Sequence, residues 1–330
     1  MLKEKVLNTI NKYNMITKED KNILIAVSGG FDSTCLLYLL NELKTELNIN
    51  LYVAHINHGL RENAILDEEF VKKTCCKLDI PFFVDKPNIN EIAKIEKMSI
   101  EMAGRKARYE FFDKIAKENN CTKIALAHNA NDNVETILLN LFRGSGLNGL
   151  KGIKKVRDNK YIRPLIEITR KEIDEWLKEN NITARLDESN NESEYTRNKV
   201  RNELLPYIQK NFNENVIANI NRMSDNITED DEYINNVVED LFNQNVINCE
   251  NDSIVINGKK IINYEINIQK RLILKCIEKL NGTTMQIEQV HINDILKMIN
   301  KNVGNKFICP NKYLKVYLNR GKVYFTKQNI

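Results

Sequence analysis

Two periods of apolar residues alternate along the first half of the chain. Short runs rich in β-branched residues, typical of buried strands, are each followed by a longer stretch with apolar residues at helical spacing. This alternation predicts an α/β fold with a parallel, doubly wound, Rossmann-like sheet and helices on both faces. The predicted strands are residues 23–27, 51–56, 82–84 and 123–127, and the predicted helices are roughly residues 33–47, 62–79, 98–119 and 131–143.

The second half of the chain has a different pattern. Glycine is absent from Lys154 to Asn257, and most of this stretch has helical spacing. From Lys306 onward alternation returns, with turn residues at Pro310-Asn311 and at Asn319-Arg320-Gly321. We therefore expect one α/β domain over residues 1–215, then a helical region with a small α+β C-terminal domain over residues 216–330. The later helices are expected over residues 170–180, 200–210 and much of 211–247.

Composition narrows the class of protein. Of 330 residues, 42% are hydrophobic and 28% are charged, which is ordinary for a soluble globular protein. No apolar run approaches the ~20 residues of a membrane span, and the charged N-terminus lacks the apolar core of a signal peptide. The seven cysteines include no CxxC pair, which favours buried thiols over disulfides or a metal centre. We expect a cytoplasmic protein without membrane contact.

The net charge of +4 is unevenly placed. No acidic residue follows Asp294, whereas eight basic residues do. Such a one-sign stretch is either a contact surface for a phosphate backbone or a solvated basic tail, and charge alone leaves both open. The eight are Lys297, Lys301, Lys306, Lys312, Lys315, Arg320, Lys322 and Lys327.

The segment AVSGGFDST, residues 26–34, lies where the first predicted strand meets the first helix. Glycine lets the backbone approach an anion, and the first helical turn offers unpaired N–H groups and a partial positive charge. Both features suit a phosphate. No GxxxxGK[ST] string occurs, so this is not a Walker loop. An ordinary glycine turn is the alternative, but Ser28, Asp32 and Ser33 in register favour phosphate binding.

Two histidines lie at or beyond the end of the second strand, in AHINHGLR. His55 and His58, with Arg61, are compatible with metal binding, but no third ligand is evident. Contact with a nucleotide or phosphate is favoured, and Asn57 between them belongs to the same candidate site. Solvent-facing loop histidines are the alternative.

A third cluster lies on the helix predicted over residues 98–119, where Glu101, Arg105, Arg108 and Tyr109 share one face. The two arginines suit phosphates or a polarised carbonyl. Taken alone, the cluster is better explained by a surface pair of Glu101 with Arg105, which is worth little energy.

The string AHNANDNVET follows the fourth strand. His128 leaves the strand, and Asp132 and Glu135 lie one helical turn apart at the start of a helix. Paired carboxylates there can hold magnesium or an incoming ammonium group. Helix capping by Asn131 or Asp132 is the alternative, and both can hold at once. The glycine-rich stretch over residues 142–152 is either a lid, an RNA contact or a plain connector.

Two further arginines, Arg197 and Arg201, are four residues apart and therefore share a helix face. Two guanidinium groups on one face suit a triphosphate or an RNA backbone, and a solvated helix face is the equally weighted alternative. Just before them, Asp187, Ser189 and Asn190 can form a rigid turn.

Taken in order, these clusters resemble the tRNA(Ile)-lysidine synthetases, a family of PP-loop ATP pyrophosphatases. The resemblance covers residues 23–206, and the tail from His291 is similar to the family's first C-terminal domain. A further C-terminal domain of longer members is expected to be absent. The matching strings are SGGFDS, HINHGLR, GRKARY, HNANDNVET, RGSGLNGL, RPL, DESN and RNKVR.

The chain departs from the family pattern beside His128. The family usually has a second histidine where this chain has Asn129, and Asp-Asp-Gln where this chain has Asn131-Asp132-Asn133. Family roles are therefore carried to His128, Asp132 and Glu135 only.

The resemblance implies a two-step reaction on the wobble cytidine of tRNA(Ile) with a CAU anticodon. The cytosine 2-carbonyl oxygen attacks the α-phosphate of ATP and expels pyrophosphate, and the ε-amine of free L-lysine then displaces AMP. Mg²⁺ is the implied cofactor, with Asp32 as its ligand. Asp132 and Glu135 are expected to bind the lysine ammonium, and His128 to take its proton.

The resemblance implies one set of catalytic residues and one set of ATP-binding residues. It also implies that the second domain binds tRNA. The sequence leaves open whether the chain forms a homodimer. The residues expected to act in catalysis are Asp32, Arg105, Arg108, His128, Asp132 and Glu135. The residues expected to bind ATP are Ser28, Gly29, Gly30, Phe31, Asp32, Ser33, His55, Asn57, His58, Arg61, Arg197 and Arg201.

Three other functions compete with this one. A PP-loop tRNA cytidine thiolase, or another adenylating tRNA-modifying enzyme, shares the loop, but a thiolase needs paired cysteines. An amidotransferase-type synthetase needs a glutaminase domain, for which the chain has no room. A non-catalytic RNA-binding or nucleotide-sensing module would not require Asp32, His128, Asp132 and Glu135 together.

Overall fold

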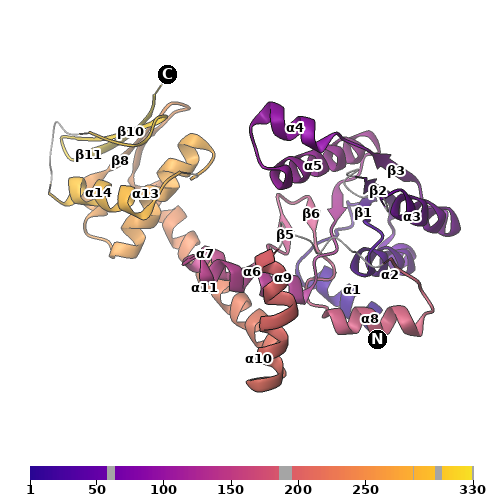
Figure 1. Ribbon diagram of the computed structural model, residues 1–330. Helices are drawn as coiled ribbons and strands as arrows, with labels where there is room; N and C mark the ends of the chain where they lie inside the picture. The colour runs from indigo at the N-terminus through magenta and orange to yellow at the C-terminus, as the bar shows by residue number, and fades with distance from the viewer. Residues whose placement is uncertain (58–63, 186–194, 285, 302–306, 329–330) are drawn as a thin grey trace. The chain divides into compact units, whose positions relative to one another are not determined.

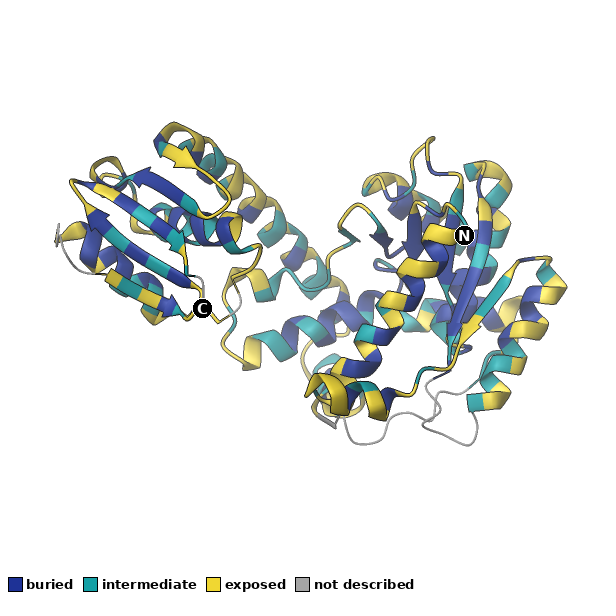
Figure 2. Cartoon of the chain, turned by 90° about the horizontal axis from the view of Figure 1, so that it is seen from above, coloured by how far each residue is buried: buried dark blue, intermediate teal, exposed yellow. Residues whose placement is uncertain are grey.

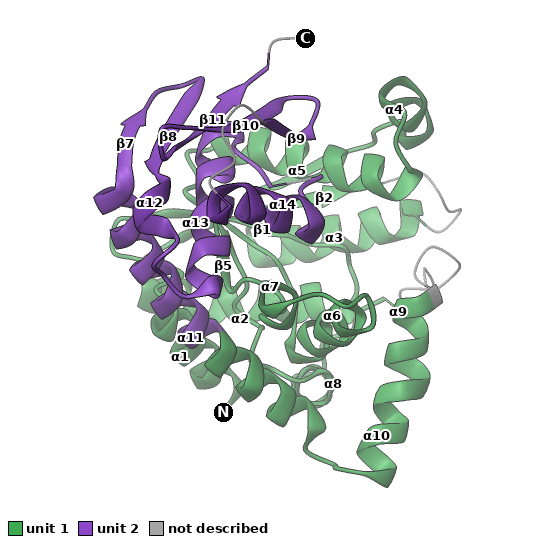
Figure 3. Cartoon of the chain, turned by 90° about the vertical axis from the view of Figure 1, so that its left-hand side faces the viewer, with its two compact units in different colours: residues 1–227 green, residues 228–330 purple. Residues whose placement is uncertain are grey.

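The computed structural model describes residues 1–57, 64–185, 195–284, 286–301 and 307–328. The chain forms two compact units, Met1–Ile227 and Thr228–Ile330, shown in green and purple in Figure 3. The predicted boundary at residue 215 lies just before helix α11 (Val216–Asn245), and the two units divide inside that helix.

The first unit is built on a six-stranded sheet in the order β3-β2-β1-β4-β6-β5. Neighbouring strands are parallel except for the β5–β6 pair. This confirms the predicted parallel Rossmann-like sheet. The chain crosses from one half of the sheet to the other after β3, so that β4 lies beside β1 and the strand order reverses between these two strands. The strands are β1 (Asn22–Ala26), β2 (Asn50–Ile56), β3 (Phe82–Asp85), β4 (Lys123–Ala125), β5 (Val156–Arg157) and β6 (Tyr161–Ile162).

Helices cover both faces of this sheet (Figure 1). Successive residues of a strand point to opposite faces. Accordingly, Ile23 and Ile25 of β1 pack into one core, with α1, α2, α3 and α8, while Leu24 packs into a second core with α5. The helices are α1 (Leu2–Lys12), α2 (Phe31–Leu47), α3 (Ala64–Leu78), α5 (Ile100–Glu118) and α8 (Arg170–Glu179).

Some elements of the first unit were not predicted. Helix α4 (Ile89–Glu96) precedes α5; the Asn88 side chain caps its start, and Lys97 in the left-handed conformation ends it. Strands β5 and β6 are two residues each, too short for a periodic signal. The remaining elements of the unit are α6 (Ala130–Phe142), α7 (Leu147–Leu150), α9 (Tyr195–Lys199), the π-helical turn η1 (Val200–Leu204) and α10 (Leu205–Asn211).

The second unit pairs an antiparallel sheet of order β7-β8-β11-β10-β9 with helices on one face. Figure 2 shows buried residues alternating with more exposed ones along its strands. The α13 and α14 helices pack on the buried side, which confirms the predicted α+β domain. The elements are β7 (Val246–Cys249), β8 (Ser253–Asn257), α12 (Gly258–Ile261), α13 (Ile266–Asn281), α14 (Gln289–Asn300), β9 (Phe307–Asn311), β10 (Leu314–Asn319) and β11 (Lys322–Lys327).

One of the two predicted turns in this unit is correct. Arg320 and Gly321 both have positive φ and join β10 to β11 as a two-residue hairpin loop. The other was misplaced, because Pro310-Asn311 still belongs to β9 and the turn follows at residues 312–313. Strand β9 lies at the sheet edge, where a proline without an N–H is tolerated.

Two predictions from composition can be compared with the structure. Cys35, Cys121 and Cys276 are buried free thiols, as expected. Among the described residues, no helix is both long and apolar enough to cross a bilayer.

Candidate active site

The loop after β1 turns sharply into α2. Gly29 has φ +96°, a conformation that L side chains rarely adopt, and Gly30 is the N-cap of α2. A β-carbon at Gly29 would lie 3.4 Å from the Val71 side chain. The positive φ of Gly29 therefore calls for glycine, while the space beside Val71 of α3 would admit a β-carbon at ordinary contact distance.

Ser33 organises this loop from inside. Its buried hydroxyl accepts hydrogen bonds from the backbone N–H groups of Ser28 (3.1 Å) and Gly29 (3.2 Å) and lies 3.0 Å from the Ser28 hydroxyl. Ser28 itself is exposed. Of the two serines expected to bind phosphate, Ser33 shapes the loop from inside, and Ser28 is exposed while its hydroxyl still contacts Ser33. Phe31 and Asp32 complete the turn at the start of α2, whose first N–H groups have no acceptor within the helix.

Asp32 projects from the first turn of α2 and is largely buried, with 22% of its side chain exposed. Its Oδ1 accepts no hydrogen bond from the described residues, and its Oδ2 lies 3.8 Å from Arg170 Nη2. Burial raises the pKa of Asp32 to about 6; the charge of Arg170 opposes this rise and that of Asp132 adds to it. A buried carboxylate with an unused oxygen suits a cation.

The second strand supplies support for the loop. His55 is buried, and its Nδ1 lies 2.8 Å from the Val27 carbonyl oxygen, to which it donates. Asn57 is also buried and donates to Glu68 at 3.0 Å. His55 therefore supports the segment that leads into the loop, and Asn57 is tied to α3. His58 and Arg61 lie outside the described residues.

Arginines from two elements converge on Tyr109 of α5. The guanidinium carbons of Arg105 and Arg157 lie 5.1 and 4.5 Å from the centre of the Tyr109 ring. Arg105 and Arg108 are both exposed on α5, and their charges act on His128. The predicted Glu101–Arg105 pair is not among the ion pairs of the described residues. The cluster therefore combines cationic and aromatic side chains, and Arg105 contacts the Tyr109 ring rather than Glu101.

His128 follows β4 and contacts a residue that sequence reasoning missed. Arg163 Nε donates to His128 Nδ1 at 3.2 Å, and Arg163 Nη1 also donates to the Lys154 carbonyl. Arg163 is 4% exposed. Burial, with the charges of Arg163, Arg197, Arg105 and Arg108, lowers the pKa of His128 to about 3.

The start of α6 is a reciprocal capping box. The Asn129 side chain accepts from the Asp132 N–H at 2.9 Å, and the Asp132 carboxylate accepts from the Asn129 N–H at 3.1 Å. The cap expected from Asn131 or Asp132 thus involves Asp132, with Asn129 as its partner. Asn131 instead accepts from the Arg170 N–H at 3.0 Å, which ties α6 to the start of α8.

Arg197 and Arg201 each form ion pairs with both Asp132 and Glu135. We call these two arginines the arginine clamp. Arg201 donates to Glu135 at 2.6 Å and to Asp132 at 2.8 Å, while Arg197 donates to Glu135 at 2.8 Å. Glu135 is 1% exposed, so its charge needs these partners. The structure therefore brings together four residues that the sequence placed in two separate roles, lysine binding and ATP binding.

The glycine-rich stretch after α6 is partly fixed. Asn133 Oδ1 accepts from the Ile153 N–H at 2.6 Å, and a β-carbon at Gly152 would lie 2.2 Å from that same oxygen. This end of the stretch is a packed connector. At Gly144 and Gly146, in contrast, an added β-carbon would meet no atom within 4 Å.

Two residues of this site escaped sequence reasoning, Arg163 and Arg170. Both lie in the stretch IRPLIEITRKEI, and Arg163 begins the matching string RPL, but the sequence indicated no role for either residue. Their contacts to His128 and Asp32 arise only when β6 and α8 pack beside β4 and α2. The signal that could have found them is the density of basic residues beside a strand end.

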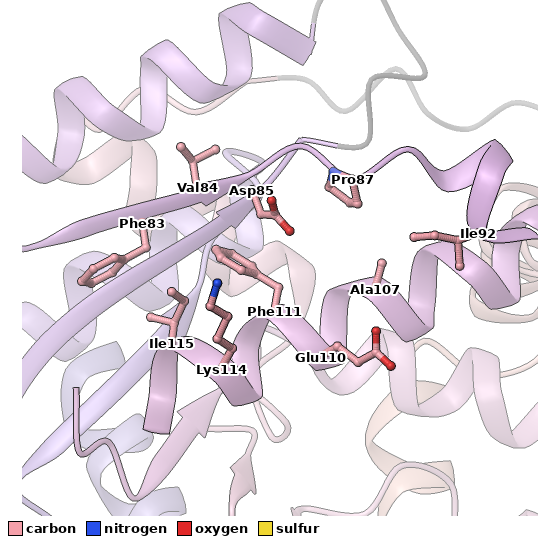
Figure 4. Close-up of a pocket in the computed structure, with 10 residues that line it drawn as sticks. All are labelled: Phe83, Val84, Asp85, Pro87, Ile92, Ala107, Glu110, Phe111, Lys114 and Ile115. Atoms are coloured by element: carbon pink, nitrogen blue, oxygen red, sulfur yellow. The ribbon is translucent and has the colours of Figure 1, made fainter. Parts of the chain in front are cut away.

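A separate pocket of about 400 Å³ lies between β3 and the α4–α5 pair (Figure 4). None of the residues selected from the motifs lines it, so it is distinct from the site around Asp32 and His128. Its lining consists of Phe83, Val84, Asp85, Pro87, Ile92, Ala107, Glu110, Phe111, Lys114 and Ile115.

No group of three or more His, Cys, Asp or Glu side chains gathers as a metal site in the described part of the chain. A cation at Asp32 would take only one carboxylate from the protein. Mg²⁺ commonly binds in this way, because it keeps waters and takes phosphate oxygens as its other ligands. The unused Oδ1 of Asp32 fits that arrangement.

The chain is similar to known proteins over most of its length. Residues 2–208 match the family model for the PP-loop domain. A tRNA(Ile)-lysidine synthase from Clostridium tetani is 47% identical over 97% of this chain and 68% of its own length. A second, from Clostridioides difficile, is 40% identical over 100% of this chain and 71% of its own length.

Among solved structures, the U34-tRNA thiolase NcsA from Methanococcus maripaludis, with its [4Fe-4S] cluster, superposes with a TM-score of 0.58. It is 20% identical, over 69% of this chain and 80% of its own. At that identity the likeness shows a shared fold alone.

Proposed function

The chain belongs to the tRNA(Ile)-lysidine synthases, a family of PP-loop enzymes, and from that membership we propose how its own residues divide the reaction. The enzyme is a carbon–nitrogen ligase that uses ATP to modify the wobble cytidine of tRNA(Ile) with a CAU anticodon. The observation that carries the assignment of roles is the meeting of the β1–α2 loop, Asp32, His128 and the clamped pair Asp132–Glu135 at one edge of the sheet.

The first role is to bind ATP so that its α-phosphate can be attacked. In our proposal, the Ser28–Ser33 loop and the first turn of α2 hold the β- and γ-phosphates. Asp32 would hold Mg²⁺, which when bound neutralises the departing pyrophosphate. The free oxygen of Asp32 and its raised pKa support this role, because both reflect a buried carboxylate that lacks a full counter-charge.

The second role is to receive free L-lysine. Asp132 and Glu135 are the acidic pair best placed to bind its ammonium group, but in the free protein the arginine clamp occupies them. Guanidinium groups bind phosphates as well as carboxylates. We therefore propose that the triphosphate draws Arg197 and Arg201 away, so that ATP binding opens the acidic pair to lysine.

A conservative variant separates these two roles. Glu135→Gln keeps the size of the side chain but removes the charge that would hold lysine. We expect the variant to release pyrophosphate in the presence of ATP and tRNA(Ile) within about tenfold of wild type, and to lose lysine transfer by about 100-fold or more. Single-turnover assays with labelled ATP and labelled lysine measure both steps.

A matched control and a contradicting outcome complete this test. Glu118→Gln, an exposed carboxylate at the end of α5, should change neither step. Lysine transfer by Glu135→Gln at the wild-type rate would remove Glu135 from the lysine site.

The third role is to bind tRNA, and we assign it to residues 216–330. We assign catalysis to the domain over residues 1–215. On the sheet face of the second unit that α13 and α14 do not cover, Lys315 and Tyr317 of β10 alternate with buried residues. On the paired strand β11, Lys322 and Tyr324 do the same, and the two tyrosine rings stack at 4.8 Å. Lysines beside aromatic rings on an open sheet suit an RNA backbone and its bases.

A further inference from the structure

We propose that Arg163 is a positioning residue that fixes His128 as the neutral imidazole protonated on Nε2. In this state His128 donates a hydrogen bond to the α-phosphoryl oxygens and does not accept the proton of lysine. The proposal deepens the function assigned above and rests on it.

The contact between the two residues dictates the tautomer. A guanidinium group has only donors, so the His128 nitrogen that Arg163 Nε approaches at 3.2 Å must offer a lone pair. That nitrogen is Nδ1, and the ring proton therefore lies on Nε2. The two ring nitrogens lie on opposite edges of the imidazole, so the Nε2–H points away from Arg163.

His55 in the same site has the opposite arrangement. Its Nδ1 lies 2.8 Å from the Val27 carbonyl oxygen, and a carbonyl can only accept. His55 therefore carries its proton on Nδ1, on the ring edge that faces the protein. The site thus holds one histidine in each tautomer, each fixed by a different backbone or side-chain partner.

The surroundings of His128 disfavour a second proton. Arg163 is 4% exposed, and among the described residues no carboxylate forms an ion pair with it. Arg105, Arg108 and Arg197 add their charges around the ring, and the pKa of His128 falls to about 3 mainly through burial. An imidazole with one nitrogen already bonded to a cation is a poor proton acceptor and a good neutral donor.

A donor at this position serves both chemical steps. In the first, negative charge moves onto the α-phosphoryl group as the cytosine oxygen attacks and pyrophosphate leaves. In the second, the amine nitrogen bonds to cytosine C2 while the C2–O bond breaks, and the electron pair leaves with AMP. A fixed N–H directed at the α-phosphoryl oxygens stabilises the charge in each step without changing its own protonation state.

The proton of the lysine ammonium then needs another acceptor. Among the residues of this site, the carboxylates of Asp132 and Glu135 remain, once the arginine clamp has moved to the triphosphate. The expectation that His128 takes this proton is therefore replaced by its transfer to the acidic pair.

Nitrogen NMR of histidine-labelled free enzyme tests the tautomer without any substrate. We expect His128 to show an unprotonated Nδ1 and a protonated Nε2, with no titration from about pH 5.5 to 8. His55 serves as the internal reference with the reverse pattern, and the variants His128→Gln and His55→Gln assign the signals. A protonated Nδ1 on His128, or titration near neutral pH, would overturn the proposal.

The kinetics of two His128 variants distinguish whether His128 acts as a hydrogen-bond donor or as a base. Glutamine can donate from an amide nitrogen near the Nε2 position but cannot act as a base, whereas leucine can do neither. We expect His128→Leu to slow pyrophosphate release and lysine transfer alike, each by about 100-fold, and His128→Gln to stay within about tenfold of wild type in both. Pyrophosphate release unaffected in His128→Leu, with lysine transfer lost in both variants, would show that His128 is the base.

The role of Arg163 is tested through the same readouts. Arg163→Met should let the His128 tautomers mix and lower kcat by at least about tenfold, with the KM values for ATP and tRNA within about twofold of wild type. Arg163→Lys retains a donor and should recover part of the loss. An unchanged tautomer in Arg163→Met would refute the positioning role. Absence of lysidine with the wild-type enzyme, with the tautomer as expected, would instead count against the assigned function.

Discussion

At the scale of single residues, the site depends on which partner each polar group meets. His55 lies at the end of β2 and His128 follows β4, yet one bonds a carbonyl oxygen and the other a guanidinium, and their chemistry differs for that reason. Asp32 lacks a close counter-charge, whereas Asp132 and Glu135 share two. From residue type alone, the two histidines would be expected to behave alike, and so would the three carboxylates.

The raised pKa of Asp32 has a consequence for stability. Its pKa in the folded protein is about 6 against an ordinary value of 3.8, so the folded state holds this proton more tightly than the unfolded state. Stability from this group is therefore greatest below about pH 4 and is lost as pH rises through about 6. At pH 7.5 the ionised Asp32 destabilises the free enzyme.

We expect Asp32→Asn to raise the free energy of unfolding at pH 7.5 by about 1–3 kcal/mol without Mg²⁺ or ATP, and to abolish activity. The gain should disappear near pH 4. Urea unfolding followed by the fluorescence of Trp176, the single tryptophan, reports on the first unit alone. Glu118→Gln is the matched control, and a loss of stability in Asp32→Asn at pH 7.5 would contradict the charge argument.

At the scale of elements, the ends of the β1, β2 and β4 strands and the start of α2 and α6 create the site. Much of this was predictable, because SGGFDS and HNANDNVET each follow an apolar strand and open a helix. Arg163 and Arg170 were not, because their partners lie far away in the sequence and meet them only through packing. The clamp was also missed, since helical spacing places Arg197 and Arg201 on one face without saying what that face contacts.

The loop after β1 gives a test at this scale. Gly29→Ala forces a β-carbon onto φ +96° and to within 3.4 Å of Val71. We expect a loss of about 1–2 kcal/mol in unfolding free energy and a larger loss of ATP-dependent activity, because the loop must shift. Gly146→Ala, which meets no atom within 4 Å, is the control. Wild-type stability and activity in Gly29→Ala would show that the loop does not need its left-handed residue.

The arginine clamp gives a second test. Arg201→Met leaves Arg197 to balance the charge of the buried Glu135, and we expect the first unit to lose about 2–4 kcal/mol. Adding Glu135→Leu removes the charge that was left behind and should restore more than half of this loss. Urea unfolding of the two single variants and the double variant, monitored at Trp176, gives the coupling energy. Strictly additive effects would show that the clamp does not stabilise the free enzyme.

At the scale of the whole molecule, the chain joins a catalytic unit to a second unit with a basic sheet face. Removing everything after about Val290 would delete α14 and the strands β9, β10 and β11, which supply much of the second unit's core. Surface substitutions therefore test its role better than truncation. The basic tail was visible in the sequence, but the placement of Lys315 and Lys322 on one sheet face beside stacked tyrosines was not.

We expect Lys315→Gln and Lys322→Gln, combined, to weaken tRNA(Ile) binding by about tenfold at moderate salt and to flatten the dependence of log Kd on log salt by about one unit per lost phosphate contact. ATP binding should stay unchanged. Lys72→Gln, an exposed lysine on α3, is the control. The same tRNA affinity and salt slope as wild type would remove this sheet face from the RNA surface. Filter binding over a salt series measures the tRNA(Ile) affinity of the wild type, the double variant and the control.

The measurement that bears most directly on the central claim is the incorporation of labelled lysine into a tRNA(Ile) transcript with a CAU anticodon, with ATP and Mg²⁺. Methionine tRNA and a reaction without ATP are the controls. We predict label in the isoleucine tRNA alone, and only with ATP. Formation of AMP and pyrophosphate without label would contradict lysine as the nucleophile, and the absence of both label and pyrophosphate would contradict the catalytic function itself.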